Sequence, residues 1–336
     1  MEMLDRTFRI YRDHFLTFIV PVAVISVPLT LINSIVGFWY GERLANFSLA
    51  FRQLSAGGRM SASQQQSLMN ANSEFINVLV VVGAVTVVTG LLQTVLLNGI
   101  ITYLTSESQF GRRATLGEAF RVVFGRMTSL TLSMILLFGL MIALLIGLSI
   151  ILFACGLGFG VLLYVWLAAS SLLVPVMVLE RTDIMLGLRR AWSLGKMRIW
   201  PITGMQLAVV LISYVVALGL AVVTTVFTQN AAAVSTTAGD VSAIVLQALV
   251  TILLAPVLPI AMTLLYYDAR VRSEGFDIAL KSSGNPDARP ADLASPQPTD
   301  PFLSGKDLSN IGMMIALSMG LIIGLFCLLS AAGGLM

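Results

Sequence analysis

Charged residues are scarce in this sequence. Asp, Glu, Lys and Arg make up 11% of the 336 residues, whereas an ordinary soluble domain carries about 25%. Apolar residues supply 57% of the chain. A soluble fold of this length could not solvate its surface with so few charges, so a soluble globular protein is excluded. The composition indicates a chain that exposes much of its surface to lipid.

Residue types that carry catalysis or bind metals are also scarce. His14 is the one histidine, and no HExxH, phosphate-binding loop or CxxC pattern is present. Cys155 and Cys327 fall within apolar segments, where they are interpreted as packing residues. The sequence therefore predicts no catalytic residue, no metal site and no cofactor, and it favours a protein that is not an enzyme.

Long apolar segments fill most of the chain. Each exceeds the roughly 20 residues that a helix needs to cross a bilayer. They are unbroken runs of Leu, Ile, Val, Ala and Gly, unlike the alternating strands of a membrane barrel. The fold class predicted is an all-α polytopic membrane protein with seven spans. These spans cover residues 15–38, 75–104, 128–154, 157–179, 201–228, 241–267 and 311–333.

The distribution of basic residues predicts an orientation. Seventeen of the 20 Lys and Arg lie before the first span or in every second connection after it. The other three, Arg43, Arg52 and Arg59, lie in the 39–74 segment, which is expected to be an external loop with a short interfacial helix at 41–54. Because basic residues stay on the cytoplasmic side, we expect a bacterial inner-membrane protein with its N-terminus inside and its C-terminus outside. The basic residues are thus explained by topology, and no nucleic-acid partner is expected.

Three similar segments lead into spans one, three and five. They read TFRIYRDHFLTF from Thr7, AFRVVFGRMTSL from Ala119 and AWSLGKMRIWPI from Ala191. Each begins with an aromatic followed by basic residues, which is typical of an amphipathic elbow at the membrane surface. They predict three helical hairpins, although any short basic stub between two spans would look similar. The candidate lipid-phosphate or partner-binding residues here are Arg121, Arg126, Arg190 and Trp192.

The end of span six carries the most distinctive pattern, YYDARVRSEGFDI from Tyr266 to Ile278. On a continuing helix, Asp268–Arg272 and Arg270–Glu274 are four residues apart and would pair, and Gly275 would end the helix. One interpretation is a salt-bridged helix end. The other assigns Asp268, Arg270, Arg272 and Glu274 to a pocket for a lipid phosphate or a surface for a partner protein.

This ending, together with the Arg190-Ala191-Trp192 elbow and six spans with basic elbows, resembles one family. It is similar to the membrane domain that accompanies glycerophosphoryl diester phosphodiesterases in some bacteria, with its stand-alone relatives. The resemblance covers roughly residues 5–280 and implies a six-span unit. The catalytic barrel of the phosphodiesterase, with its histidines and metal-binding carboxylates, is missing from the sequence. The resemblance therefore implies an architecture and not a phosphodiesterase activity.

Uncharged polar residues and prolines interrupt the spans. Gly90, Thr94 and Asn98 lie four residues apart on span two, where they would form interhelical hydrogen bonds or line a substrate path. The span cores contain no ionisable residue, which argues against proton-coupled transport. Kinks are expected in spans one and six, at Pro21, Pro28, Pro256 and Pro259.

The chain divides into three parts. Residues 1–280 form the six-span domain, and residues 281–306 are rich in proline and predict a disordered cytoplasmic linker. Residues 307–336 carry the seventh span, expected to stand apart from the six-span unit. Gly320 and Gly324 give it a small-residue face for other membrane proteins.

These features favour a non-enzymatic membrane module that organises lipids or partner membrane proteins. Its expected partners are anionic lipid headgroups at the elbows and other membrane proteins at the seventh helix. The alternative is a transporter or channel for a lipid-like or small neutral solute. A membrane-embedded lipid hydrolase is the remote alternative.

Overall fold

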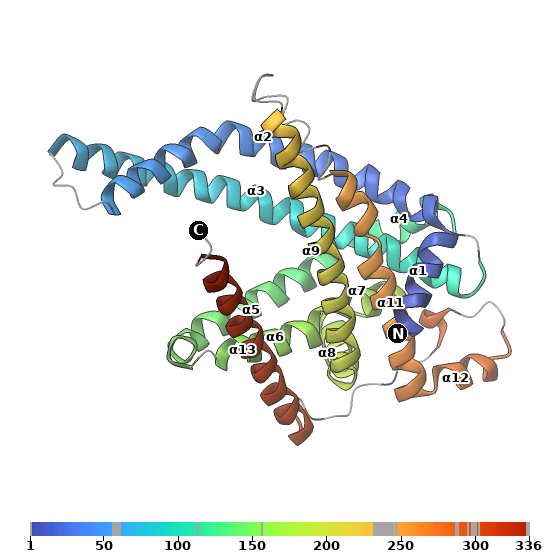
Figure 1. Cartoon of the computed structure of the whole chain (residues 1–336). Helices are drawn as coiled ribbons and strands as arrows, with labels where there is room; N and C mark the ends of the chain where they lie inside the picture. The colour runs from blue at the N-terminus through green and yellow to red at the C-terminus, as the bar shows by residue number, and fades with distance from the viewer. Residues whose placement is uncertain are drawn as a thin grey trace.

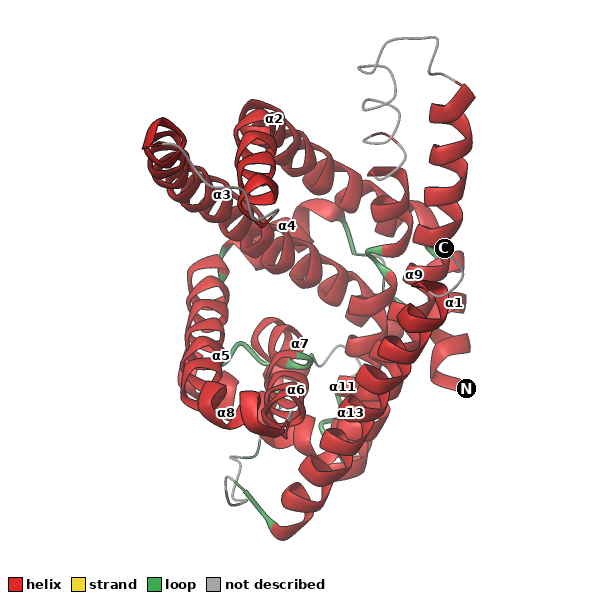
Figure 2. Cartoon of the chain, turned by 60° about the vertical axis from the view of Figure 1, so that its left-hand side comes forward, coloured by secondary structure: helices red, strands yellow, loops and turns green. Residues whose placement is uncertain are grey.

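Helices make up every regular element of the described chain. The computed structural model describes residues 2–55, 62–112, 114–155, 157–230, 245, 248–285, 289–293, 296, 301 and 303–333. In these residues Figure 2 shows helices joined by short loops and no strand. Six helical segments are long and apolar enough to cross a membrane: Phe15–Gly41, Phe75–Gln109, Met127–Gly147, Gly158–Leu179, Ile199–Leu220 and Ala248–Glu274. The chain is an all-α, multi-pass membrane protein, as its composition predicts.

The first two spans belong to two long helices. Helices α2 (Phe15–Ser55) and α3 (Ala62–Gln109) lie side by side as an extended hairpin (Figure 1). At 1.5 Å per residue, 41 residues of α2 reach about 60 Å, twice the thickness of the hydrocarbon core. The separate helix expected at 41–54 is therefore wrong. Residues 42–54 continue α2, because this stretch contains no proline to stop the helix.

Each of the three predicted elbows forms a short helix that leads into a span. These short helices are α1 (Glu2–Asp13), α4 (Leu116–Phe124) and α8 (Ile184–Met197). One or two residues separate each of them from the helix that follows. The spans that follow are α2, α5 (Met127–Cys155) and α9 (Ile199–Asn230). We call the part of the molecule formed by α1, α4, α8 and the end of span six the basic end. The descent of the three elbows from one repeated hairpin stays a prediction.

Helix α4 shows how the sequence fixes an elbow. The Thr115 hydroxyl accepts a hydrogen bond from the backbone N–H of Glu118, whose carboxylate accepts one from the N–H of Thr115. This capping box starts the helix. Ala119 and Val123 are buried against the protein, whereas Arg121 is exposed. The helical spacing predicts an amphipathic helix on the membrane surface, and the structure turns Ala119 and Val123 of its apolar stripe toward the protein.

Two spans are broken within their apolar length. Span four consists of α6 (Leu157–Ser170) and α7 (Leu173–Leu179), separated by a two-residue turn. Span six is helical over 248–254, turns at residues 255–256 and continues as α11 (Val257–Glu274). Proline explains both breaks, because Pro175 and Pro259 lack the N–H that would bond to the carbonyl four residues earlier. The break in span six confirms the expected kink, and the break in span four was not predicted.

Span four is the central helix of the molecule. Its apolar window is 72% buried, whereas the window of span two is 11% buried. Helix α8 packs closely across α6 at Gly195, where an added Cβ would collide with the carbonyl oxygen of Ala168. Glycine is therefore required at this crossing. The other neighbours of α6 are α5, α9 and α13 (Gly305–Gly333).

The expectation that the seventh span stands apart is wrong for its described residues. Helix α13 packs along α6 (Figure 1), and a Cβ on Gly160 would lie 2.5 Å from the Cα of Ile315. The Tyr164 hydroxyl donates to Asp307 Oδ1 at 2.9 Å. Glycine at position 160 allows this close approach of the two helices. Whether α13 crosses the membrane stays a prediction.

The described parts of the predicted linker are also held against the spans. Pro290 is buried, and Arg289 Nε lies 3.4 Å from Glu107 Oε1. Arg190 and Lys196 donate to the carbonyl oxygens of Pro296 and Pro301 at 2.5 and 2.7 Å. The prediction of a disordered linker is thus wrong for these residues, because backbone carbonyls and one ion pair anchor them without an apolar core.

Candidate functional site

Helices α7, α8 and α11 meet around one buried carboxylate at the basic end. Glu180 follows directly after α7 and is 7% exposed. Arg190 of α8 places Nε 2.5 Å from Glu180 Oε2, and its Nη2 donates to Oε1 at 2.9 Å. The Tyr266 hydroxyl of α11 donates to the same Oε1 at 2.9 Å. Glu180 therefore joins three helices.

A second carboxylate completes this ion cluster, which consists of Glu180, Arg190, Arg270 and Glu274. Glu274 lies 2.9 Å from Arg190 and 3.0 Å from Arg270, and the guanidinium of Arg270 also lies over the ring of Phe276. Both arginines are 2% exposed. Burial lowers the pKa of Arg190, but its hydrogen bond with Glu180 and the charges of Glu180 and Glu274 outweigh burial and raise it overall. The two arginines and the two carboxylates of the ion cluster thus balance one another in charge.

The two ion pairs predicted at the end of span six are confirmed. Arg270–Glu274 and Asp268–Arg272 lie at 3.0 and 2.8 Å, and Gly275 ends the helix at φ 62°. Only the second pair is on the surface, where the Arg272 side chain is 66% exposed. Asp268 also pairs with Arg198 of the elbow before α9. The matched charges favour a structural role for the ion cluster.

The sequence did not reveal the partner that holds these arginines together. Glu180 follows directly after the seven residues of α7, all of which are buried. A carboxylate directly after such a run was the available signal, because a charge at the edge of a buried span needs a partner. Its partners lie 10 and 90 positions further along the chain, at Arg190 and Arg270, and spacing alone cannot pair them.

The remaining elbow residues have different surroundings. Arg121 is exposed on α4, and Arg126 donates to the carbonyl oxygen of Thr182 at 3.1 Å. Burial and the charge of Arg181 lower the pKa of Arg126, whereas Asp183 raises it. Trp192 is 8% exposed and packs edge-on against Tyr164, with ring centroids 6.0 Å apart. Trp192 therefore belongs to the interface between α8 and α6.

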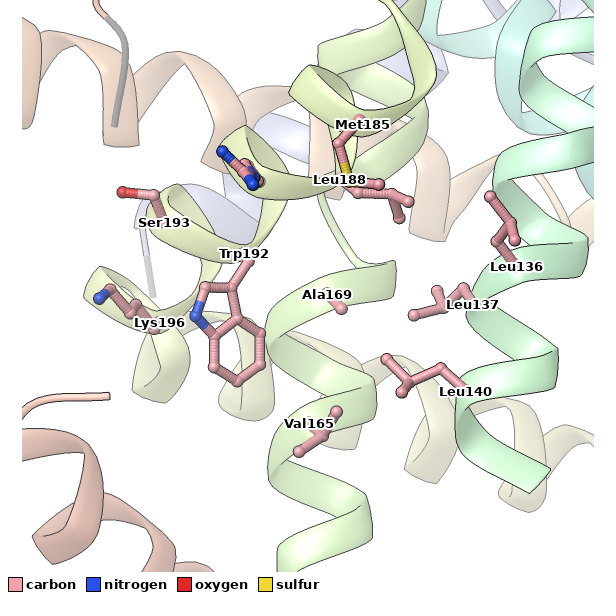
Figure 3. A pocket seen from close by; sticks show the side chains of 11 residues that line it. Leu136, Leu137, Leu140, Val165, Ala169, Met185, Leu188, Trp192, Ser193 and Lys196 are labelled. Atoms are coloured by element: carbon pink, nitrogen blue, oxygen red, sulfur yellow. The ribbon is translucent and has the colours of Figure 1, made fainter. Parts of the chain in front are cut away.

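An apolar groove opens beside Trp192, between α5, α6 and α8 (Figure 3). Its volume is about 610 Å³. Leu137 and Leu140 of α5 face Val165 and Ala169 of α6 across it, whereas α8 supplies its polar side chains. These are Arg189, Ser193 and Lys196. The groove thus combines an apolar wall with a cationic mouth, and we call it the basic groove.

The groove runs from the basic end into the membrane-spanning part. Leu140 lies 13 residues after the start of α5, about 20 Å along the helix. Arg189 is exposed and forms no ion pair with any described residue, whereas Lys196 lies 3.9 Å from Asp307. No Asp or Glu is among the described residues that line the groove. Its mouth therefore carries net positive charge.

The three residues of the polar stripe predicted on span two do not share one environment. Thr94 and Asn98 line a second cavity of about 240 Å³, whereas Gly90 is exposed and lies outside it. Neighbouring polar residues instead join α3 to α2, as interhelical packing predicts. Asn33 donates to Thr89 at 3.0 Å, and Gln93 donates to the Ser26 hydroxyl at 3.4 Å. Gln247, a polar residue within the predicted span 241–267, lies outside the described residues.

No family model, curated protein or solved structure matches this chain. The similarity to the membrane domain of glycerophosphoryl diester phosphodiesterases therefore stays a prediction. Any function has to be argued from the groove, the cavity and the ion cluster themselves.

Proposed function

We propose that this protein is a non-enzymatic membrane module that binds an anionic phospholipid in the basic groove. The observation that carries the proposal is an apolar groove with a cationic mouth and no carboxylate in its described lining. We further propose that the basic end faces the cytoplasm of a bacterial inner membrane, because Lys and Arg are retained on that side. The lipid would then come from the cytoplasmic leaflet.

The apolar wall suits an acyl chain. Leu136 and Leu140 are 46% and 48% exposed in the groove, so a hydrocarbon chain lying against them replaces contacts with bulk lipid. Membrane lipid is as apolar as leucine, so this contact alone gives little selectivity. The wall therefore positions the acyl chain, and the mouth of the groove determines which lipid headgroup is bound.

The mouth suits a phosphate. Arg189 has no ion-pair partner among the described residues and can form a paired, bidentate contact with phosphate oxygens. The Lys196 ammonium adds positive charge, although its contacts with Pro301 and Asp307 hold it in place. Trp192 lies between Lys196 and Val165 of the apolar wall (Figure 3), where an amphipathic ring suits the headgroup level. The arrangement favours an anionic headgroup over a zwitterionic one.

The test compares two exposed arginines at the basic end. Arg189→Ala removes the groove cation that has no ion pair with any described residue, and Arg121→Ala is the matched control on α4, outside the groove. A basic residue near an anionic surface contributes about 1 kcal/mol, so we expect about a fivefold loss of anionic lipid from Arg189→Ala. Native mass spectrometry of the purified variants, reconstituted with mixed anionic and zwitterionic lipids, measures the bound ratio.

A second variant, in the apolar wall of the basic groove, distinguishes the effect of groove shape from the effect of charge on lipid binding. Leu140→Trp narrows the groove and is expected to lower the retention of both lipid classes, while Arg189→Ala lowers only the anionic class. Equal anionic-lipid loss from Arg189→Ala and Arg121→Ala would mean that diffuse surface charge, and not the groove, holds the lipid.

A further inference from the structure

The second cavity lies where the two broken spans meet. Ser170, Ser171 and Pro175 line it from the break in span four, and Leu258 and Pro259 line it from the break in span six. We call it the polar cavity. It is built by segments from several helices, and no residue of the ion cluster lines it.

A break in a membrane-spanning helix leaves backbone polar groups without their helical partners. An unpaired backbone group in hydrocarbon costs several kcal/mol, so irregular backbone is tolerated only where protein or a polar cavity covers it. Pro175 and Pro259 deprive the carbonyls of Ser171 and Ala255 of their usual helical partners. Both breaks lie at one cavity, which is the arrangement that substrate sites of membrane transporters use.

The opposite wall of the polar cavity is a polar face of α3. Thr94, Asn98 and Thr102 follow one another at four-residue spacing, and all three line it. Thr102 accepts a hydrogen bond from the Thr263 hydroxyl at 3.3 Å. Asn98, in contrast, forms no hydrogen bond with any described residue. Its amide therefore has one acceptor and two donor hydrogens available for a ligand.

Helix α9 contributes a second amide. Gln206 donates to the Ser171 hydroxyl at 2.9 Å, which orients both groups at the cavity wall. Two aromatic rings, Phe138 and Trp166, complete the lining with centroids 5.3 Å apart. The wall thus offers hydroxyls, amides and ring faces, groups that can donate, accept and pack against C–H bonds.

The charge and size of the cavity limit the ligand. None of the described lining residues is Asp, Glu, Lys, Arg or His, and an ion buried without a counter-charge is strongly disfavoured. The volume of about 240 Å³ is far above the roughly 15 Å³ that one water needs and below the usual range for drug-sized ligands. A ligand that fits this cavity would therefore be small and uncharged.

We propose that the polar cavity is a binding site for a small uncharged solute that both donates and accepts hydrogen bonds, such as a polyol or urea. This site is independent of the lipid proposed for the basic groove. The two share α5 and α6 but differ in the faces of those helices that they use.

The test measures the reactivity of one cysteine in the cavity. Cys155 and Cys327 are replaced by Ala, and Asn98→Cys is introduced into the full chain. Methyl methanethiosulfonate reacts with the thiolate, which forms in water and is suppressed in a dry apolar interior. Val95→Cys is the matched control, because Val95 is fully buried on the same helix and does not line the cavity. We expect Asn98→Cys to react at least about tenfold faster than Val95→Cys.

Binding of a solute in the cavity is then detected as protection of the introduced cysteine from the reagent. Glycerol and urea are titrated separately, and at least one is expected to slow the reaction of Asn98→Cys by about twofold or more, as competition for one site requires. Lys281→Cys, at an exposed position on α12 (Phe276–Ser282), corrects for any direct effect of the solutes on the reagent.

Two results overturn the proposal. If Asn98→Cys reacts as slowly as Val95→Cys, the cavity is dry or filled by lipid. If it reacts quickly but neither solute protects it, the cavity holds water only. Thr94→Cys, on the same face one turn away, replaces Asn98→Cys if that variant does not give a monodisperse protein. Neither overturning result changes the lipid ratio measured for Arg189→Ala, so the two proposals fail separately.

Discussion

The basic groove and the polar cavity lie on two faces of the same helices. On α6, Val165 and Ala169 line the groove, whereas Trp166 and Ser170 line the cavity. Successive residues of a helix point about 100° apart, so a one-residue step changes the site that a side chain faces. Two sites of different chemistry can therefore share one helix.

The difference in charge between the two sites follows from the helices that supply their polar side chains. The groove takes its cations from α8, an elbow helix outside the six apolar segments, where a guanidinium can remain solvated. The cavity is lined by residues of the apolar segments, and the polar groups of its described lining are all neutral. Charge is inexpensive at the ends of the spans and costly within them, so among the described lining residues a cationic side chain is found only at the mouth of the groove.

The largest effect is expected from the support that both sites share. Glu180→Gln removes one of the two negative charges in the ion cluster and leaves Arg190 and Arg270 buried with one carboxylate. Breaking a buried pair costs about 3 kcal/mol or more. The unfolding temperature in detergent should fall clearly, and both lipid retention and solute protection should weaken together.

Arg272→Ala is the control for this change, since it breaks only the exposed pair with Asp268. It should leave the unfolding temperature unchanged. A Glu180→Gln protein as stable as the wild type would show that the ion cluster does not support either site.

A smaller effect should separate the two sites. Gly195→Ala forces a methyl group into the carbonyl oxygen of Ala168 and pushes α8 away from α6. Overpacking of this kind costs about 1–3 kcal/mol. Because α8 lines the groove and not the cavity, lipid retention should fall while protection of Asn98→Cys persists.

Gly204→Ala is the matched control on α9, where an added Cβ meets nothing within 4 Å. In a helix with free space this change should be neutral or stabilise by up to about 1 kcal/mol. If Gly195→Ala behaves like Gly204→Ala, the close crossing of α8 and α6 is not needed for the groove.

The smallest effect concerns the acid sensitivity of the α13 contact. Burial raises the pKa of Asp307, but hydrogen bonds from Ser304 and Tyr164 and the charge of Lys196 lower it overall, below its ordinary value of 3.8. A lowered folded-state pKa stabilises the protein above the unfolded value, and this contribution is lost as the pH falls through the folded value. The α13 contact should therefore weaken only in acid, below about pH 4.

Asp307→Asn removes this titration. We expect it to cost about 1 kcal/mol at neutral pH and to flatten the acid limb of unfolding temperature against pH. If the unfolding temperature falls equally in acid for both proteins, the acid sensitivity comes from other carboxylates. Anionic-lipid retention should not fall, because Asp307 does not line the groove and its replacement removes a counter-charge from Lys196.

The sequence predicted the features that depend on neighbours along the chain. The apolar segments, the three amphipathic elbows, the i,i+4 pairs at Asp268–Arg272 and Arg270–Glu274, and the stop at Gly275 all follow from helical spacing. The break in span six followed from Pro256 and Pro259 in the same way. Pro175 carried the same signal for span four and was overlooked.

The features that the sequence could not predict depend on which helix faces pack together. Glu180 meets Arg270 across 90 residues, and α13 packs on α6 because Gly160 leaves room for Ile315. Composition and periodicity thus determined a helical membrane protein with basic elbows, since burial in lipid imposes those constraints locally. The tertiary structure alone decided that one helix borders both an apolar groove with a cationic mouth and a neutral polar cavity, because rotation and packing of helices are set by contacts between distant residues.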